Sequence, residues 1–303
     1  MSDRPVVIEA AISGSGAQAN PNIPRTNGEI ARDALACFDA GAAIVHSHSS
    51  DLRLTGEAGA RSYAESWRGV FVQRPEALLC PTATIVGPGE DRLTHVPPLV
   101  RDGQIRMAVF DPGTLNFGSA AEDGTPLADD MIYTNSYRDI DRAFALMRRL
   151  RIGASLAIYE PGFLRATLAF HQAGKLPRGS MVKLYFGGDF NIRTGRRSSV
   201  NFGLPPTAKA LDAYLEMLEG SGLEWAVAVL GGDVVRSGMA RLALERGGHL
   251  RVGLEDYMGD RTPTNAELVA EAVALCREVG RPVATIAETL AILDMPEPVL
   301  ASA

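Results

Sequence analysis

Eight short apolar stretches, most of them rich in β-branched residues, recur along the chain and are separated by longer stretches with helical periodicity. Strands that alternate with helices form a parallel sheet, and eight such units in 303 residues suit a closed barrel. We therefore predict an α/β fold, a (β/α)8 TIM barrel, with residues 1–303 as a single domain. The predicted strands are Val6–Ile12, Ala43–His48, Leu78–Thr84, Met107–Phe110, Ser155–Tyr159, Met181–Phe186, Trp225–Leu230 and Leu250–Leu254.

An open doubly wound sheet is the alternative architecture, but no Gly-x-Gly-x-x-Gly motif opens the first helix, which disfavours dinucleotide binding. Capping boxes, in which a Thr and a Glu three residues later satisfy the first free amides, predict helix starts at Thr26–Glu29 and Thr264–Glu267. Loops are expected at Ser49–Arg61 and Gly187–Ser199. Further helices are predicted at Tyr137–Leu150, Gly162–Ala173, Thr207–Leu218 and Val234–Arg246.

The composition excludes several function classes. The formal net charge is −6, whereas nucleic-acid-binding proteins usually carry a basic face, so no nucleic-acid partner is expected. Cys37, Cys80 and Cys276 form no Cys-x-x-Cys pair, which favours a reducing compartment. Neither a signal peptide nor an apolar run of about 18 residues is found. We expect a cytoplasmic protein with no membrane partner.

A His-x-His pattern ends the second predicted strand. Strand side chains alternate between faces, so His46 and His48 point the same way, and the carboxyl end of a barrel strand is where active sites lie. Two inward imidazoles make a divalent-metal site plausible; the simpler interpretation is two polar residues that line the barrel mouth. The other histidines, His95, His171 and His249, are interpreted as structural.

Two adjacent carboxylates, Glu255 and Asp256, follow the eighth predicted strand. Carboxylates at the end of an apolar strand are costly to bury unless they are paired or bound to a metal. Glu255 can complete a His₂Glu ligand set with open positions for water or substrate. Asp256 is then available as a general base, with Arg251 to orient it. A surface salt bridge at a strand end is the alternative.

At this point the chain resembles the β-keto acid cleavage enzymes, the family that includes 3-keto-5-aminohexanoate cleavage enzyme. Each matching stretch is modest by itself, but together they occur in order over nearly the whole chain. The stretches are Pro21–Pro24 with Thr26, Ala40–Ala42, Ile44–His48, Gly113–Gly118, Gly247–Asp256, Asn265 with Leu268 and Val269, and Gly280–Thr285.

The resemblance implies a (β/α)8 homotetramer with zinc on His46, His48 and Glu255 and with acetyl-CoA as co-substrate. Family members condense a β-keto acid with acetyl-CoA to give acetoacetate and a new acyl-CoA. By this resemblance Asp256, held by Arg251, removes a proton from the β-keto acid. The enolate then attacks the thioester, and the released CoA thiolate cleaves the carbon chain by a retro-Claisen step.

Five more residues are predicted to bind substrate. Thr82 and Thr84, at the end of the third strand, can hydrogen-bond the substrate or an oxyanion. The alternative is that they only bond the local backbone. Arg193 forms, with Arg196 and Arg197, a basic loop that suits CoA phosphates or an anionic substrate tail. The alternative is a loop that is only solvated. The five residues are Thr82, Thr84, Asn116, Glu160 and Arg193.

The chain departs from the family pattern in three places. Gly153–Ala157 lacks two acidic residues that many relatives carry on the fifth strand, and Cys80–Thr84 replaces a Gln-x-Ser-Thr-Gly-Gly stretch. An acidic residue of the amine-accepting relative is missing near Gly16. With fewer acids in the cavity, an aminated substrate has less to pair with, so we predict that 3-keto-5-aminohexanoate is not the preferred β-keto acid.

Two rival functions stay open on sequence grounds. A CoA-independent zinc aldolase or hydrolase would use the same ligands on the same barrel. A metal-bearing barrel that only binds a ligand would show no turnover at all. Consumption of acetyl-CoA separates the first rival from the cleavage reaction. The His₂Glu set serves several divalent metals, of which zinc is the expected one.

Overall fold

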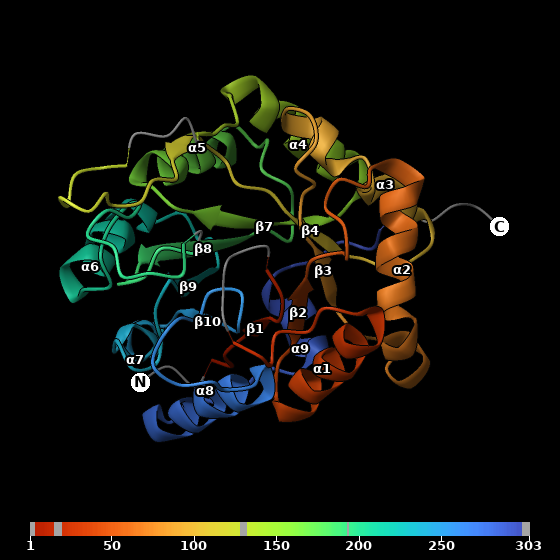
Figure 1. The fold of residues 1–303 in the computed structure, drawn as a ribbon. Helices are drawn as coiled ribbons and strands as arrows, with labels where there is room; N and C mark the ends of the chain where they lie inside the picture. The colour runs from red at the N-terminus through yellow and green to blue at the C-terminus, as the bar shows by residue number, and fades with distance from the viewer. Residues whose placement is uncertain (1–3, 15–19, 128–131, 193, 299–303) are drawn as a thin grey trace.

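The computed structural model describes residues 4–14, 20–127, 132–192 and 194–298. Eight parallel strands form one sheet in the order β3-β2-β1-β10-β9-β8-β7-β4, and β3 also contacts β4. The sheet therefore curls into a nearly closed barrel (Figure 1), which confirms the predicted (β/α)8 fold. All eight strands overlap the predicted stretches. They are β1 (Ile8–Ala11), β2 (Ile44–Ser47), β3 (Leu79–Pro81), β4 (Met107–Val109), β7 (Gly153–Ile158), β8 (Met181–Gly187), β9 (Trp225–Leu230) and β10 (His249–Val252).

Helices surround the strands in Figure 1. The capping boxes predicted at Thr26 and Thr264 are both present, and each begins a helix at the next residue. Within the described ranges, none of the helices is both long and apolar enough to cross a membrane. The helices are α1 (Asn27–Ala40), α2 (Gly56–Gln73), α3 (Val96–Arg101), α4 (Tyr137–Leu150), α5 (Pro161–Gln172), α6 (Ala208–Leu218), α7 (Met239–Glu245), α8 (Asn265–Val279) and α9 (Ile286–Ile292).

Two sequence predictions need correction. The helix predicted at Val234–Arg246 begins only at Met239, because Gly238 has a φ of 81°, a left-handed conformation that cannot continue a helix. The stretch predicted as a loop at Ser49–Arg61 contains the start of α2, which follows Thr55 as its N-cap residue.

Some elements over the barrel mouth were not predicted at all. A 3-10 helix, η1 (Gly89–Leu93), follows β3. A small antiparallel pair, β5 (Leu115–Asn116) with β6 (Ile132–Tyr133), follows β4. These segments are too short for a periodic pattern to show in the sequence.

The barrel interior changes from apolar to charged along the strand direction. At the amino ends of the strands, apolar side chains such as Val7, Ile44 and Met181 pack together with residues of the α9 region. Two positions further along the same three strands stand Glu9, His46 and Lys183, all of them buried. Because strand side chains repeat with period two, each strand presents an apolar residue to the closed end and a polar one to the mouth.

Candidate active site

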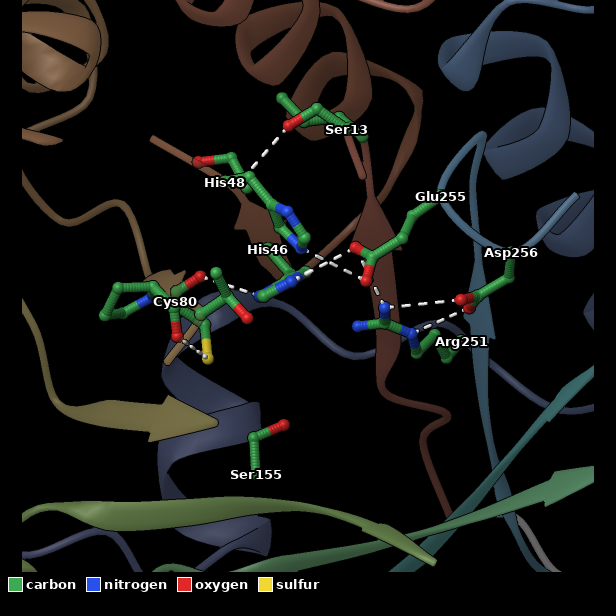
Figure 2. A network of polar contacts seen from close by, with 12 residues as sticks. Ser13, His46, His48, Cys80, Ser155, Arg251, Glu255 and Asp256 are labelled. Carbon is green, nitrogen blue, oxygen red and sulfur yellow. Dashed lines mark hydrogen bonds and ion pairs between the residues drawn. The ribbon is translucent and has the colours of Figure 1, made fainter. Parts of the chain in front are cut away.

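His46, His48 and Glu255 converge at the mouth of the barrel (Figure 2). His46 lies on β2 and His48 just beyond it, whereas Glu255 lies in the turn after β10. The Nε2 atom of His46 is 3.1 Å from Glu255 Oε2, and the Nε2 atom of His48 is 3.3 Å from Glu255 Oε1. One ligand atom from each of the three residues lies within 4.8 Å of the other two. Residues far apart in sequence thus present three donor atoms to one point.

The surroundings of the two imidazoles suit a metal. The Nδ1 atom of His46 is 2.9 Å from the Cys80 carbonyl oxygen, an orientation that turns Nε2 toward Glu255. Burial lowers the pKa of His46, although Glu255 opposes this, and a neutral ring is the form that binds metal. The ring nitrogens of His48 are buried, and apart from the contact with Glu255 they have no hydrogen-bond partner among the described residues.

The turn that carries Glu255 is fixed against the end of β1. The Glu255 backbone N–H donates to the Ala11 carbonyl oxygen over 3.1 Å. Asn265, the first residue of α8, accepts from the Leu254 N–H at 2.7 Å and donates to the Ile12 carbonyl oxygen at 2.9 Å. A Cβ atom on Gly14 would stand 2.8 Å from the Glu255 Cγ atom, so glycine is required there for this close approach.

Arg251 connects the carboxylates of the site. Its Nε donates to Asp256 Oδ2 over 2.8 Å, and its Nη2 lies 3.1 Å from Glu255 Oε2. Its Nη1 donates to Glu9 on β1. The guanidinium is buried, so three carboxylates compensate one desolvated cation, as buried charges require.

Figure 2 shows the Arg251 guanidinium in contact with the carboxylates of both Glu255 and Asp256. Burial raises the pKa of Asp256, the Arg251 charge acts in the opposite direction, and Glu255 raises it again. Arg251 and Glu255 line the main cavity, whereas Asp256 lines a small neighbouring one. Arg251 thus lines both cavities, whereas Asp256 lies outside the described lining of the one that Glu255 faces.

A second buried ion pair crosses the barrel below the three candidate ligands. Lys183 Nζ on β8 lies 3.2 Å from Glu9 Oε1, and both side chains are at most 1% exposed. The Ser155 hydroxyl on β7 also donates to Glu9 at 3.4 Å. Burial raises the pKa of Glu9, but the Lys183 and Arg251 charges outweigh burial and bring it to about 2. Glu9 is thus an ionised residue that anchors both cations.

The three candidate ligands open onto a cavity of about 640 Å³. Its opposite wall comes from the ends of β4, β7 and β8 and from the segments over the mouth. On that wall the Tyr133 hydroxyl donates to Asp111 Oδ2 over 2.5 Å. Burial raises the pKa of Asp111, an effect that this hydrogen bond partly reverses. The residues of this wall include Arg92, Asp111, Tyr133, Ala157, Tyr159 and Tyr185, whereas Thr82 and Thr84 line the cavity just past β3, next to β2.

The predicted substrate-binding residues occupy different places. Thr82 and Thr84 line the cavity. Asn116 is exposed on β5, and Glu160 accepts a hydrogen bond from the Gly203 N–H at 2.8 Å; both lie outside the described lining of the cavity. Arg193, like the departure noted near Gly16, lies outside the described residues. Its neighbours Arg196 and Arg197 are exposed.

Several residues of the cavity lining, or of the buried ion pairs beside it, escaped the sequence interpretation. Glu9 and Lys183 carried a usable signal, since each is a charged residue inside an otherwise apolar strand, which indicates an inward-facing functional group. Asp111 directly follows a predicted strand, a position that the sequence interpretation overlooked. Arg92 and Tyr133 belong to short irregular segments, and nothing in their spacing points to a site.

The other histidines have structural surroundings. His249 Nδ1 accepts from the Val7 N–H at 3.0 Å, and its Nε2 lies 3.2 Å from Glu224 Oε2. His171 Nε2 is 2.9 Å from the Ser221 carbonyl oxygen. His95 is buried and stacks on Tyr63, with ring centroids 5.5 Å apart. None of these three lines the described part of the main cavity.

The fold and the site together define a class: a TIM-barrel enzyme whose cavity joins a possible metal-binding triad to a cluster of arginine and carboxylates. A family model described as beta-keto acid cleavage enzyme matches residues 5–295. The chain therefore belongs to the β-keto acid cleavage enzyme family, as the sequence motifs predicted.

Named relatives agree with this assignment. The chain is 29% identical to 3-oxoadipate:acetyl-CoA acetyltransferase of Cupriavidus necator, over 97% of this chain and 96% of the relative. It is 27% identical to 3-keto-5-aminohexanoate cleavage enzyme of Fusobacterium nucleatum, over 96% of this chain and 98% of the relative. Among solved structures, a ternary complex of ObcA with a C4-CoA adduct and oxalate shares the fold, with a TM-score of 0.61 and 15% identity over 90% of this chain and 68% of that one.

Proposed function

We propose that this protein condenses a β-keto acid with acetyl-CoA, in a zinc-dependent reaction, to give acetoacetate and a new acyl-CoA. The observation that carries the proposal is the convergence of His46, His48 and Glu255 with the Arg251–Asp256 pair beside one cavity. Membership of the family and the similarity to an acetyl-CoA acetyltransferase support the choice of acetyl-CoA as co-substrate.

We infer that His46, His48 and Glu255 hold the metal, because two imidazoles and a carboxylate form the donor set of many catalytic zinc sites. Three protein ligands leave coordination positions for the substrate. A bound divalent cation supplies Lewis acidity, which polarises the ketone and acidifies the C–H bonds between the ketone and the carboxylate.

The remaining steps depend on residues of this chain. Arg251 faces the cavity and stabilises negative charge that develops on the substrate. Asp256 accepts the proton from the carbon between the two carbonyl groups. Because Arg251 stands between Asp256 and the cavity, we infer that the guanidinium moves aside when the substrate binds. The hydroxyls of Thr82 and Thr84 line the same cavity and can donate to substrate oxygens.

Carbon–carbon bond formation and cleavage then balance. The deprotonated carbon forms a bond to the acetyl carbonyl carbon, and CoA leaves as its thiolate. The thiolate attacks the original ketone, the bond between that carbonyl and the central carbon breaks, and the electron pair returns to the central carbon. Asp256 returns its proton there, so the products are acetoacetate and the new acyl-CoA.

The experiment that tests this function incubates zinc-loaded protein with acetyl-CoA and a panel of β-keto acids and follows the acyl-CoA pool by mass spectrometry. A new acyl-CoA should appear together with acetoacetate, and its mass names the substrate. The Asp256→Asn variant should lose at least about 100-fold in rate, the contribution of a positioned base, while it keeps its zinc. NMR of deuterium exchange at the central carbon, without acetyl-CoA, reports the proton step alone.

An unchanged acyl-CoA pool from zinc-loaded protein would contradict the proposal. Cleavage of a keto acid without acetyl-CoA consumption would instead favour a zinc aldolase or hydrolase. Normal deuterium exchange in Asp256→Asn would remove Asp256 from the base role and leave the reaction itself intact.

We extend the proposal to three further properties. The family resemblance supports a homotetramer, which light scattering after size-exclusion chromatography can test. Three free cysteines, all buried, support a reducing compartment such as the cytoplasm, which fractionation of the source cells can test. One cooperative unfolding transition is expected if residues 1–303 form a single domain.

A further inference from the structure

Arg92 is a cation in the opposite wall of the cavity, contributed by η1. Its side chain is half-buried, and its Nε donates to the Gly87 carbonyl oxygen over 3.0 Å. The guanidinium carbon lies 5.3 Å from the centroid of the Tyr133 ring. This stacking and the backbone bond fix the plane of the guanidinium and leave its two terminal nitrogens for another group.

The other cations of the cavity differ from Arg92 because they are already paired. Lys183 lies 3.2 Å from Glu9, and Arg251 contacts Glu9, Glu255 and Asp256. No carboxylate of the described residues lies within 4 Å of the Arg92 guanidinium nitrogens. Among the described residues that line the cavity, Arg92 is therefore the cation whose positive charge has no ion-pair partner.

We propose that Arg92 binds a second carboxylate, at the far end of the β-keto acid, so that the preferred substrate is a 3-oxo dicarboxylic acid. An arginine fork matches the geometry of a carboxylate and can bind both of its oxygens. The keto-acid end of the substrate faces His46, His48 and Glu255, and its tail extends along the wall toward Tyr133 and Arg92. This inference rests on the proposed function for the identity of the keto-acid end.

The position of Arg92 favours the substrate tail over the phosphates of CoA. Arg92 shares one cavity of about 640 Å³ with the three candidate metal ligands. In acetyl-CoA the whole pantetheine arm separates the reacting thioester from the phosphates, so a phosphate has to lie well outside a cavity of this size when the thioester is inside. A carboxylate on a short carbon chain spans the same cavity.

The charge of the surrounding wall agrees with an anionic tail. Among the described residues, the carboxylate on this wall is Asp111, which accepts a hydrogen bond from the Tyr133 hydroxyl. Burial also raises the pKa of Asp111, which reduces its repulsion of an anion. On β7 this chain presents the uncharged Ser155 and Ala157, and Ala157 lines the cavity. The cavity offers little to an amine and one unpaired cation to a carboxylate.

The test compares 3-oxo dicarboxylic acids of five, six and seven carbons with their ω-methyl esters, in which the distal charge alone is removed. For the wild type we expect the diacid to exceed its ester in kcat/KM at one chain length. Arg92→Gln should reduce this preference about 10- to 100-fold, the range for one charge-assisted interaction, and Arg92→Lys should retain part of it. The KM for acetyl-CoA should not change.

Arg53→Gln is the matched control, because Arg53 is near the mouth but exposed and already bonded to Asp51. It should leave the preference intact. An equal diacid preference in Arg92→Gln and wild type overturns the inference, as does a raised KM for acetyl-CoA with an unchanged preference, which would assign Arg92 to CoA.

Calorimetry with the saturated diacids glutarate, adipate and pimelate, without acetyl-CoA, separates this inference from the proposed function. Binding that weakens in Arg92→Gln, in protein that turns over no β-keto acid, supports the anion site and contradicts the reaction. Turnover with no diacid preference supports the reaction and contradicts the anion site.

Discussion

The two sides of the cavity differ in the elements that supply their functional groups. On the side of β1, β2 and β10, the functional groups lie on strands or within four residues of a strand end, and buried ion pairs connect them. On the side of β4, β7 and β8, aromatic rings and one hydrogen-bonded acid line the wall, and Arg92 and Tyr133 come from η1 and β6. The first side has the fixed geometry that bond-making requires. The second side is held by a few contacts of short segments, so we expect substitutions there to alter substrate preference more than the fold.

The largest effect is expected from removal of a candidate metal ligand on the side of β1, β2 and β10. His48→Ala deletes one of three donors, and we expect zinc content after dialysis to fall below about a tenth of the wild-type value, with activity reduced at least 100-fold. Elemental analysis and the acyl-CoA assay measure the two quantities. His171→Ala is the control, since His171 bonds to the Ser221 carbonyl oxygen away from the cavity. Full zinc occupancy in His48→Ala would remove His48 from the ligand set.

The next effect concerns the ion pair that links the two sides. Glu9→Gln leaves Lys183 and Arg251 buried without one of their counter-charges, and breaking a buried pair from one side costs about 3–5 kcal/mol. We expect the free energy of unfolding, measured with urea, to fall by an amount in this range. kcat should also fall, because Arg251 loses an anchor, while zinc content stays at the wild-type level.

The double variant Glu9→Gln/Lys183→Met tests the cause of that loss. Lys183→Met removes the cation that Glu9→Gln leaves unpaired, so the double variant should regain a substantial part of the lost stability. Its kcat should stay low, since Arg251 still lacks Glu9. If the double variant loses more free energy of unfolding than the two single variants lose in sum, Lys183 has another role.

The difference between the two sides also explains how far the sequence could predict the molecule. The eight strands were predictable because buried parallel strands are short apolar runs between helical patterns. His46, His48 and Glu255 were predictable because period two and a strand end define where their side chains point. Asn116 lies in a motif that the family resemblance singled out, yet it is exposed on β5, because the resemblance identifies residues and not the path of a loop.

Positions that depend on the path of irregular segments could not be predicted. Arg92 reaches the cavity because η1 folds back over β3, where the Thr84 N–H donates to the Arg92 carbonyl oxygen over 2.9 Å. Tyr133 reaches it because β6 pairs with β5. Neither contact leaves a periodic trace in the sequence. Glu9 and Lys183 are an intermediate case, since their strands were predicted and the charges within them were visible.

The smallest effect is expected on the side of β4, β7 and β8, from Tyr133→Phe. The lost hydroxyl donates to Asp111, and a net loss of about 1 kcal/mol in the free energy of unfolding is expected at neutral pH. The hydrogen bond favours the ionised carboxylate, and burial has raised the pKa of Asp111 above its usual 3.8, so removing the hydroxyl raises that pKa further. Zinc content should be unchanged, because no candidate ligand is touched.

The pH dependence of this loss separates the lost hydrogen bond from a packing defect. As the pH falls through the raised pKa of Asp111, the carboxyl becomes protonated in both proteins, and a hydrogen bond to a neutral carboxyl is worth less than one to a carboxylate. The stability difference between wild type and Tyr133→Phe should therefore grow as the pH rises from 4 to 8. Tyr159→Phe on the same wall is the control, since no hydrogen bond of its hydroxyl is found among the described residues, and its difference from wild type should not depend on pH. A constant difference for Tyr133→Phe would mean that Asp111 keeps one protonation state over this pH range, and the loss of stability would then not be distinguishable from a packing defect.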